Sequence, residues 1–160
     1  MANQQGNFGF RPVLMMGSAY NGQGQQEMTI ASNETNSIFM GDPVVLNANG
    51  SISRGSSAGA ELVGIFNGCF YTDPTTQKPT FSNHYPGAIV ADDIVANVIS
   101  DPDVIFEVKV DDTNGGRAQV GSTANIATYS AGSTKSGISN VALDGDTFAT
   151  SNASNFAVYD

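Results

Sequence analysis

The sequence predicts an all-β protein: a compact antiparallel β-barrel or β-sandwich with little or no helix and an extended N-terminal arm. No window of a dozen residues places apolar side chains at helical spacing between good helix formers. Short apolar or alternating runs occur instead, each bounded by Gly, Pro, Asn or Asp. Glycine accounts for 18 of the 160 residues, and many short strands joined by glycine-rich turns are typical of sandwiches and barrels.

In chain order, the first expected element is the arm, residues 1–12. Its opening residues are rich in Gln, Asn and Gly and carry too little apolar content to fold on themselves. The arm ends with Phe8, Phe10, Arg11 and Pro12. It is either a terminal tail without a role or a segment that orders on a partner, with the two aromatic rings in pockets and the arginine on a carboxylate.

The strands expected after the arm are short, and one turn between them has a strong signature. Asn49-Gly50 interrupts an apolar run, and both residue types tolerate the positive φ of a type I′ hairpin turn. Residues 106–110 alternate strictly between apolar and charged side chains, which indicates a strand with one buried face. The expected strands are 12–16, 27–31, 44–46, 62–71, 88–99, 104–110, part of 119–129, 138–143 and 156–159.

The charge distribution suggests a division near residue 90. The first 90 residues hold five acids and three bases, whereas the remainder holds ten acids and three bases. We therefore expect a β-barrel-like module over 13–90 and an acidic second β-module over 91–160 packed on it, with a single domain as the alternative.

Most of the negative charge lies between Asp92 and Asp112. Solvated turns and a charged strand face explain it most simply, and a calcium site built by the fold is the alternative. A spaced-acid calcium loop beginning at Asp101 is excluded, because Ile105 and Phe106 occupy positions that require a ligand and a glycine. The acids concerned are Asp92, Asp93, Asp101, Asp103, Glu107, Asp111 and Asp112.

The composition also disfavours several kinds of partner. The net charge of −9 would repel nucleic-acid phosphates and anionic membrane surfaces, so neither is an expected partner. There is no run of 18 apolar residues. The N-terminus lacks the basic region of a signal peptide, which predicts a protein made and kept in a cytoplasm. The single cysteine, Cys69, cannot form an internal disulfide.

One pattern matches a catalytic motif, but its context is unsuitable. Residues 55–59 satisfy Gly-x-Ser-x-Gly, and Asp73 and His84 follow in the order found in α/β-hydrolases. Polar residues precede the serine and an apolar β run follows, instead of the required buried strand and helix. Cys69 lies in an apolar run and His84 in a loop, so neither is expected to act as nucleophile or base. The sequence predicts a non-enzyme without a metal or cofactor.

Four short motifs carry a resemblance to a known family. They are Gly-Asp-x-Val-x-Leu at 41–46, Gly-Ile-Phe-x-Gly-x-x-Tyr at 64–71, Lys-Pro-Thr-Phe-Ser at 78–82 and Asp-Pro-Asp-Val-x-Phe-Glu-Val at 101–108. In this order they resemble the capsid decoration proteins of tailed bacteriophages, also called cement or head auxiliary proteins. The resemblance covers about residues 10–111.

The resemblance implies a non-enzymatic virion protein on the capsid exterior, made in the host cytoplasm. It would bind the major capsid protein and stabilise the expanded shell. It would also associate with itself, as a trimer by analogy with trimeric family members. In that arrangement Phe8, Phe10, Arg11 and Pro12 are the expected contact with a capsid subunit or a neighbouring copy.

Two other functions remain open. A carbohydrate- or receptor-binding β-module of a phage fibre or tail would use aromatic platforms. With no Trp in the chain, Tyr20, Tyr71 and Tyr85 are the loop-placed substitutes. A head–tail connector component would share the β composition and would differ from a decoration protein in copy number.

Overall fold

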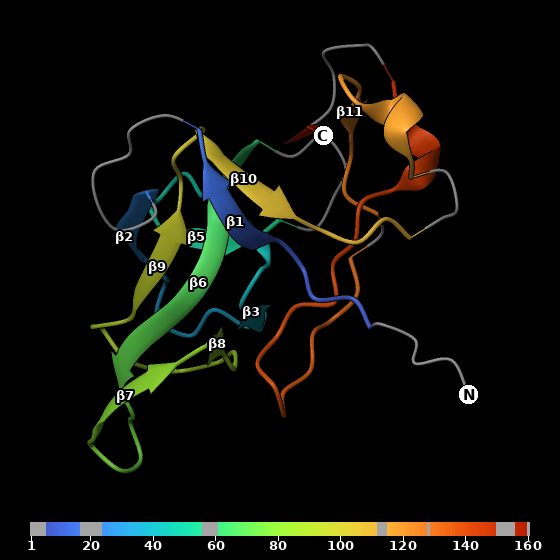
Figure 1. Ribbon diagram of the computed structural model, residues 1–160. Helices are drawn as coiled ribbons and strands as arrows, with labels where there is room; N and C mark the ends of the chain where they lie inside the picture. Colours follow the sequence, from blue (N-terminus) through green and yellow to red (C-terminus); the bar gives the residue numbers. More distant parts are fainter. Residues whose placement is uncertain are drawn as a thin grey trace.

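The computed structural model is all-β, which confirms the predicted fold class (Figure 1). It describes residues 6–16, 24–55, 61–111, 115–127, 129–149 and 156–159. Two single 3₁₀ turns, η2 (Arg117–Gln119) and η3 (Gly145–Thr147), interrupt the β structure. The strands of the described residues are β1 (Arg11–Met15), β2 (Gln25–Thr29), β3 (Ile38–Phe39), β4 (Pro43–Leu46), β5 (Ile52–Arg54), β6 (Leu62–Thr72), β7 (Pro79–Ser82), β8 (His84–Tyr85), β9 (Val95–Ile99), β10 (Val104–Glu107), β11 (Thr123–Ala124) and β12 (Phe156–Ala157).

The centre of the molecule is a small barrel built from one antiparallel sheet. Its strands follow the order β2-β9-β6-β4-β5, with β7 paired to the far end of β6. Ile30, directly after β2, forms a parallel bridge with Ile52 in β5. This bridge joins the two edges of the sheet, so edges that would otherwise be open to other chains are partly closed.

The β4–β5 hairpin forms as predicted, but its turn is of a different type. Gly50 has φ +80°, whereas Asn49 does not have a positive φ. The Gly50 N–H donates to the Asn47 carbonyl at 2.9 Å, and the Asn47 N–H donates to the Ser51 carbonyl at 2.8 Å. These bonds define a type I turn followed by a left-handed glycine, which needs only one residue of positive φ. The predicted type I′ turn is therefore wrong.

The first hydrophobic core fills the barrel interior. β6 contributes Phe66, Cys69 and Tyr71 to it. A register shift between Phe66 and Cys69, with Gly68 at φ +117°, places both side chains on the inner face despite their odd spacing. The buried members of this core are Ile30, Ile38, Val44, Ile52, Phe66, Cys69, Tyr71, Tyr85, Ile94, Ala96 and Val98.

A second core lies on the outer face of the same sheet. Ile65 of β6 points outward and packs under the two-stranded β1–β10 ribbon and the C-terminal part of the chain. Figure 1 shows the β1–β10 ribbon at the upper end of β6, with the orange and red C-terminal segment to one side. The buried members of the second core are Phe10, Ile65, Ala124, Ile126, Val141 and Leu143.

The strand pairing does not follow the division near residue 90. β9 belongs to the second half of the sequence, yet it lies between β2 and β6 in the barrel. β1 pairs with β10, again joining the two halves. A boundary at residue 90 would therefore cut through one sheet.

Several predicted strands are shorter than expected. The run 88–99 is a strand only over β9, and it is preceded by Gly87 and Ala88 with positive φ values of +88° and +55°. The run 104–110 is a strand only over β10, and 119–129 only over β11. The run 138–143 contributes isolated bridges, from Ile138 to Met40 and from Leu143 to Val110 and Ile126.

Candidate functional site

The described end of the arm folds back onto its own chain. Phe10 is only 3% exposed and belongs to the second core. Its ring stacks on Phe156 at a centroid distance of 4.4 Å and meets the edge of Phe106 at 6.1 Å. Its N–H donates to the Gly41 carbonyl at 2.9 Å. In this structure the chain itself therefore supplies the apolar surroundings of Phe10, and contact between Phe10 and a partner stays a prediction.

The other three predicted contact residues are held close to Phe10. Arg11 and Pro12 belong to β1, so the arm ends before them. The Arg11 guanidinium forms an ion pair with Glu107, the residue opposite it on β10. It also lies 5.1 Å from the centre of the Phe8 ring. The carboxylate expected for Arg11 is therefore found within the chain, while the Arg11 and Glu107 side chains stay largely exposed.

The exposed apolar surface of this region lies on and just after β1. Val13 is 55% exposed, Leu14 62% and Met16 40%. The sequence predicted a strand over residues 12–16. It also predicted that the contact with a capsid subunit or a neighbouring copy would come from the arm. The sequence gives no sign of this exposure, because the uninterrupted apolar run Val13-Leu14-Met15-Met16 is typical of a strand that is buried on both faces.

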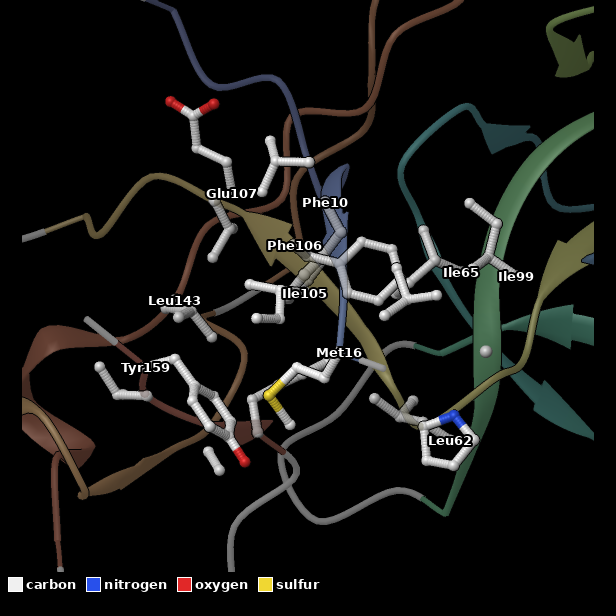
Figure 2. A pocket seen from close by; sticks show the side chains of 18 of the residues that line it. Phe10, Met16, Leu62, Ile65, Ile99, Ile105, Phe106, Glu107, Leu143 and Tyr159 are labelled. Carbon is white, nitrogen blue, oxygen red and sulfur yellow. The ribbon is translucent and has the colours of Figure 1, made fainter. Parts of the chain in front are cut away.

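An apolar hollow opens beside this strand. It has a volume of about 1000 Å³ and lies between the outer face of β6 and β9, the β1–β10 ribbon and the residues around β12. Figure 2 shows it surrounded by side chains from these distant parts of the chain. The deeper lining includes Phe10, Ile65, Ile99, Phe106 and Leu143, and exposed Val13, Met16 and Tyr159 mark its mouth.

The charged residues that line the hollow are both acidic. They are Asp101, in the β9–β10 turn, and Glu107; among the described residues no Lys or Arg contributes to the lining. Glu107 is paired with Arg11, whereas one oxygen of Asp101 accepts the Asp103 N–H at 2.8 Å. Within the described part of the chain, Asp101 is therefore the acidic residue of the lining that has no cationic partner.

A buried polar cluster fastens the C-terminal part of the chain to the barrel. Asp42, in the β3–β4 turn, is fully buried and accepts hydrogen bonds from the Phe39 N–H at 2.9 Å and the Tyr129 hydroxyl at 2.8 Å. The Arg54 guanidinium of β5 lies 3.6 Å above the Tyr129 ring. Burial raises the pKa of Asp42 above its ordinary value, and the hydrogen bonds only partly oppose this. This cluster links three separate segments, which is a structural role.

The described members of the suspected catalytic pairs are engaged elsewhere. Cys69 is buried in the barrel core, and burial raises the pKa of its thiol to about 12. The His84 ring stacks on Phe39 at 5.6 Å. Asp73 accepts the N–H groups of Thr75 and Thr76 in its own turn. In the motif 55–59 only Gly55 is described; residues 56–59 lie outside the described residues.

The acidic region is spread over several turns. Asp93 accepts the N–H and hydroxyl of Thr72, and Asp111 accepts the Gly145 N–H at 3.1 Å. Asp112 lies outside the described residues. Where the chain is described, no three His, Cys, Asp or Glu side chains are grouped in a way that could hold a metal ion.

Comparison with known proteins gives no assignment. Family models, curated proteins and solved structures all return no significant match to this chain. A search for long apolar helices that could cross a membrane also finds none among the described residues.

Proposed function

We propose that this chain is a non-enzymatic virion protein that binds the outer surface of an assembled phage capsid and stabilises it. It would act as a decoration or cement protein, with the major capsid protein and further copies of itself as partners. The observation that carries the proposal is the exposed apolar strand β1 beside an apolar hollow.

Such a surface is unusual on a chain that acts alone. Soluble monomers expose single apolar residues commonly, but a contiguous apolar patch bordered by polar residues marks an interaction site. Val13, Leu14 and Met16 are exposed apolar side chains within four consecutive residues, and Val13 and Met16 also line the hollow. The motifs at 41–46, 64–71, 78–82 and 101–108 suggest that the interaction is with a phage shell.

The barrel supplies the rigidity that this role requires. Its interior core and the second core on the outer face of the same sheet hold the β1–β10 ribbon in a defined position. A protein that binds the assembled lattice but not loose subunits stabilises the lattice by its binding free energy, repeated over many copies. No reaction at the site is needed.

The carbohydrate-binding alternative receives less support. Of its three aromatic candidates, Tyr71 and Tyr85 are buried in the barrel core. The Tyr85 hydroxyl donates to the Glu34 carbonyl at 3.0 Å, so this ring is part of the packing and offers no face to a sugar. Tyr20 lies outside the described residues.

Co-sedimentation with purified capsids tests the proposal. The protein is mixed with expanded shells of its phage and, separately, with unexpanded procapsids, and the bound copies are counted by quantitative gel analysis. We expect saturable binding to expanded shells at many copies per particle. Binding at one ring per particle would favour the connector alternative. Binding to neither shell would overturn the proposal.

A further inference from the structure

We propose that the hollow beside β1 is the docking site for a capsid-subunit segment that inserts apolar side chains and flanks them with Lys or Arg. The identity of the partner depends on the proposed function above. The chemistry of the inserted segment depends only on the shape and charge of this surface.

The shape indicates an inserted segment instead of a flat contact. A volume of about 1000 Å³ is at the upper end of the range for ligand pockets. It is large enough for more than one apolar side chain. Its deep lining is apolar and its mouth carries the exposed side chains Val13, Met16 and Tyr159. An apolar anchor that enters such a pocket and excludes water gives most of the binding energy of a typical interface.

The charge indicates what surrounds the anchor. The hollow has acidic but no basic lining residues where the chain is described, and the whole chain carries a net charge of −9. Arg11 compensates Glu107, which leaves Asp101 at the rim with Asp103 beside it in the same turn. Electrostatic complementarity then favours a basic partner and disfavours an acidic one.

The backbone of β1 argues against the addition of a partner strand. Pro12 has no N–H to donate, and the register of β1 against β10 shifts between Pro12 and Leu14. A proline and a bulge on an edge strand both hinder pairing with another chain. The partner is therefore recognised through side chains in the hollow, without main-chain pairing to β1.

A peptide experiment tests this chemistry without capsids. Two fluorescein-labelled peptides share a Leu-Phe-Leu core, one flanked by two lysines on each side and one by two glutamates. Their binding is followed by fluorescence anisotropy at low salt. We expect the lysine peptide to bind at least about tenfold more tightly than the glutamate peptide. Equal affinities, or no binding by the lysine peptide, would overturn the proposal.

Three variants locate the site. Val13→Glu combined with Tyr159→Glu places charge at the mouth and should abolish binding of the lysine peptide; both residues are more than half exposed, so the fold is retained. Asp101→Asn keeps the oxygen that accepts the Asp103 N–H but removes the charge, and should reduce the preference for lysine over glutamate. Phe81→Glu is the matched control, because Phe81 is 82% exposed and does not line the hollow.

The same variants in the capsid assay separate this inference from the proposed function. Loss of shell binding in the Val13→Glu, Tyr159→Glu variant, with normal binding by Phe81→Glu, supports both. Normal shell binding by all variants, or loss with Phe81→Glu alone, would overturn the docking site and leave the proposed function standing. Selective peptide binding without any shell binding by the unaltered chain would support the docking chemistry and overturn the proposed function.

Discussion

Replacement of Phe10 by alanine distinguishes a free arm from one that belongs to the fold. Phe10 is 3% exposed and contacts Phe156 and Phe106 through its ring. Truncation of a buried Phe to Ala costs about 3–5 kcal/mol of unfolding free energy. Part of this loss comes from the aromatic pairs, which contribute about 0.5–1.5 kcal/mol beyond the buried area.

Urea denaturation followed by circular dichroism measures the effect. With a slope of about 2 kcal/mol per molar urea, the transition midpoint should fall by about 1.5–2.5 M. The melting temperature should fall by roughly 6–20 °C, since about 1 kcal/mol corresponds to about 2–4 °C in a chain of this size. Phe8→Ala is the matched control and should cost less than about 1 kcal/mol, because Phe8 is only half-buried beside Arg11.

If Phe10→Ala costs no more than Phe8→Ala, then the ring is not part of the second core, and Phe10 would be free to contact a partner. Phe10→Leu sharpens the test, because it keeps most of the apolar volume and should lose clearly less stability than Phe10→Ala.

Three further predictions concern the barrel and its buried polar groups. Gly64→Ala should destabilise by about 1–3 kcal/mol or more in urea titrations, since the added methyl group would press on the Ile99 carbonyl of β9; an unchanged midpoint would contradict this packing. Burial raises the pKa of Asp42, so the folded state holds this proton more tightly than the unfolded chain. The resulting stability is present below the ordinary value of 3.8 and is lost as pH rises through the folded pKa. The Asp42→Asn variant has no proton to lose at this position, so its unfolding free energy minus that of wild type should rise as the pH rises from about 4 to about 8. If this difference stays constant over that pH range, the assignment is refuted. Cys69, buried and with a pKa of about 12, should react with a disulfide reagent only after unfolding; rapid reaction of the native protein would contradict its burial.

Patterns within short stretches of sequence correctly predicted the long strand β6 and the hairpin between β4 and β5. The long apolar run 62–71 is strand β6, because its length and its content of β-favouring residues leave no alternative. Asn49-Gly50 marked the hairpin, although the loop uses positive φ only at the glycine. The two-residue strands β3 and β8 were not predicted, since pairs such as His84-Tyr85 are too short to show any period.

The candidate site was harder to predict because it is assembled from segments that lie far apart in the sequence. The sequence shows that Phe10 is apolar, but not that Phe156 and Phe106 lie beside it. Closure of the barrel by Ile30 and Ile52 is likewise a non-local contact. The run Val13-Leu14-Met15-Met16 predicts a strand, but its lack of alternation is typical of burial on both faces and does not reveal that Val13 and Leu14 are exposed.

The position of the hollow couples docking to the stability of the chain. Phe10, Phe106 and Phe156 belong to or pack against the second core, and they also line the hollow. A segment bound there contacts groups that are together only in the folded state, so it must stabilise that state. At a concentration about 100 times its dissociation constant it contributes about 2.7 kcal/mol. The melting temperature should then rise by roughly 5–11 °C with the lysine peptide. No rise is expected for the Val13→Glu, Tyr159→Glu variant. A rise of equal size in that variant would mean that the peptide binds elsewhere, and the link between the second core and the docking surface would be refuted.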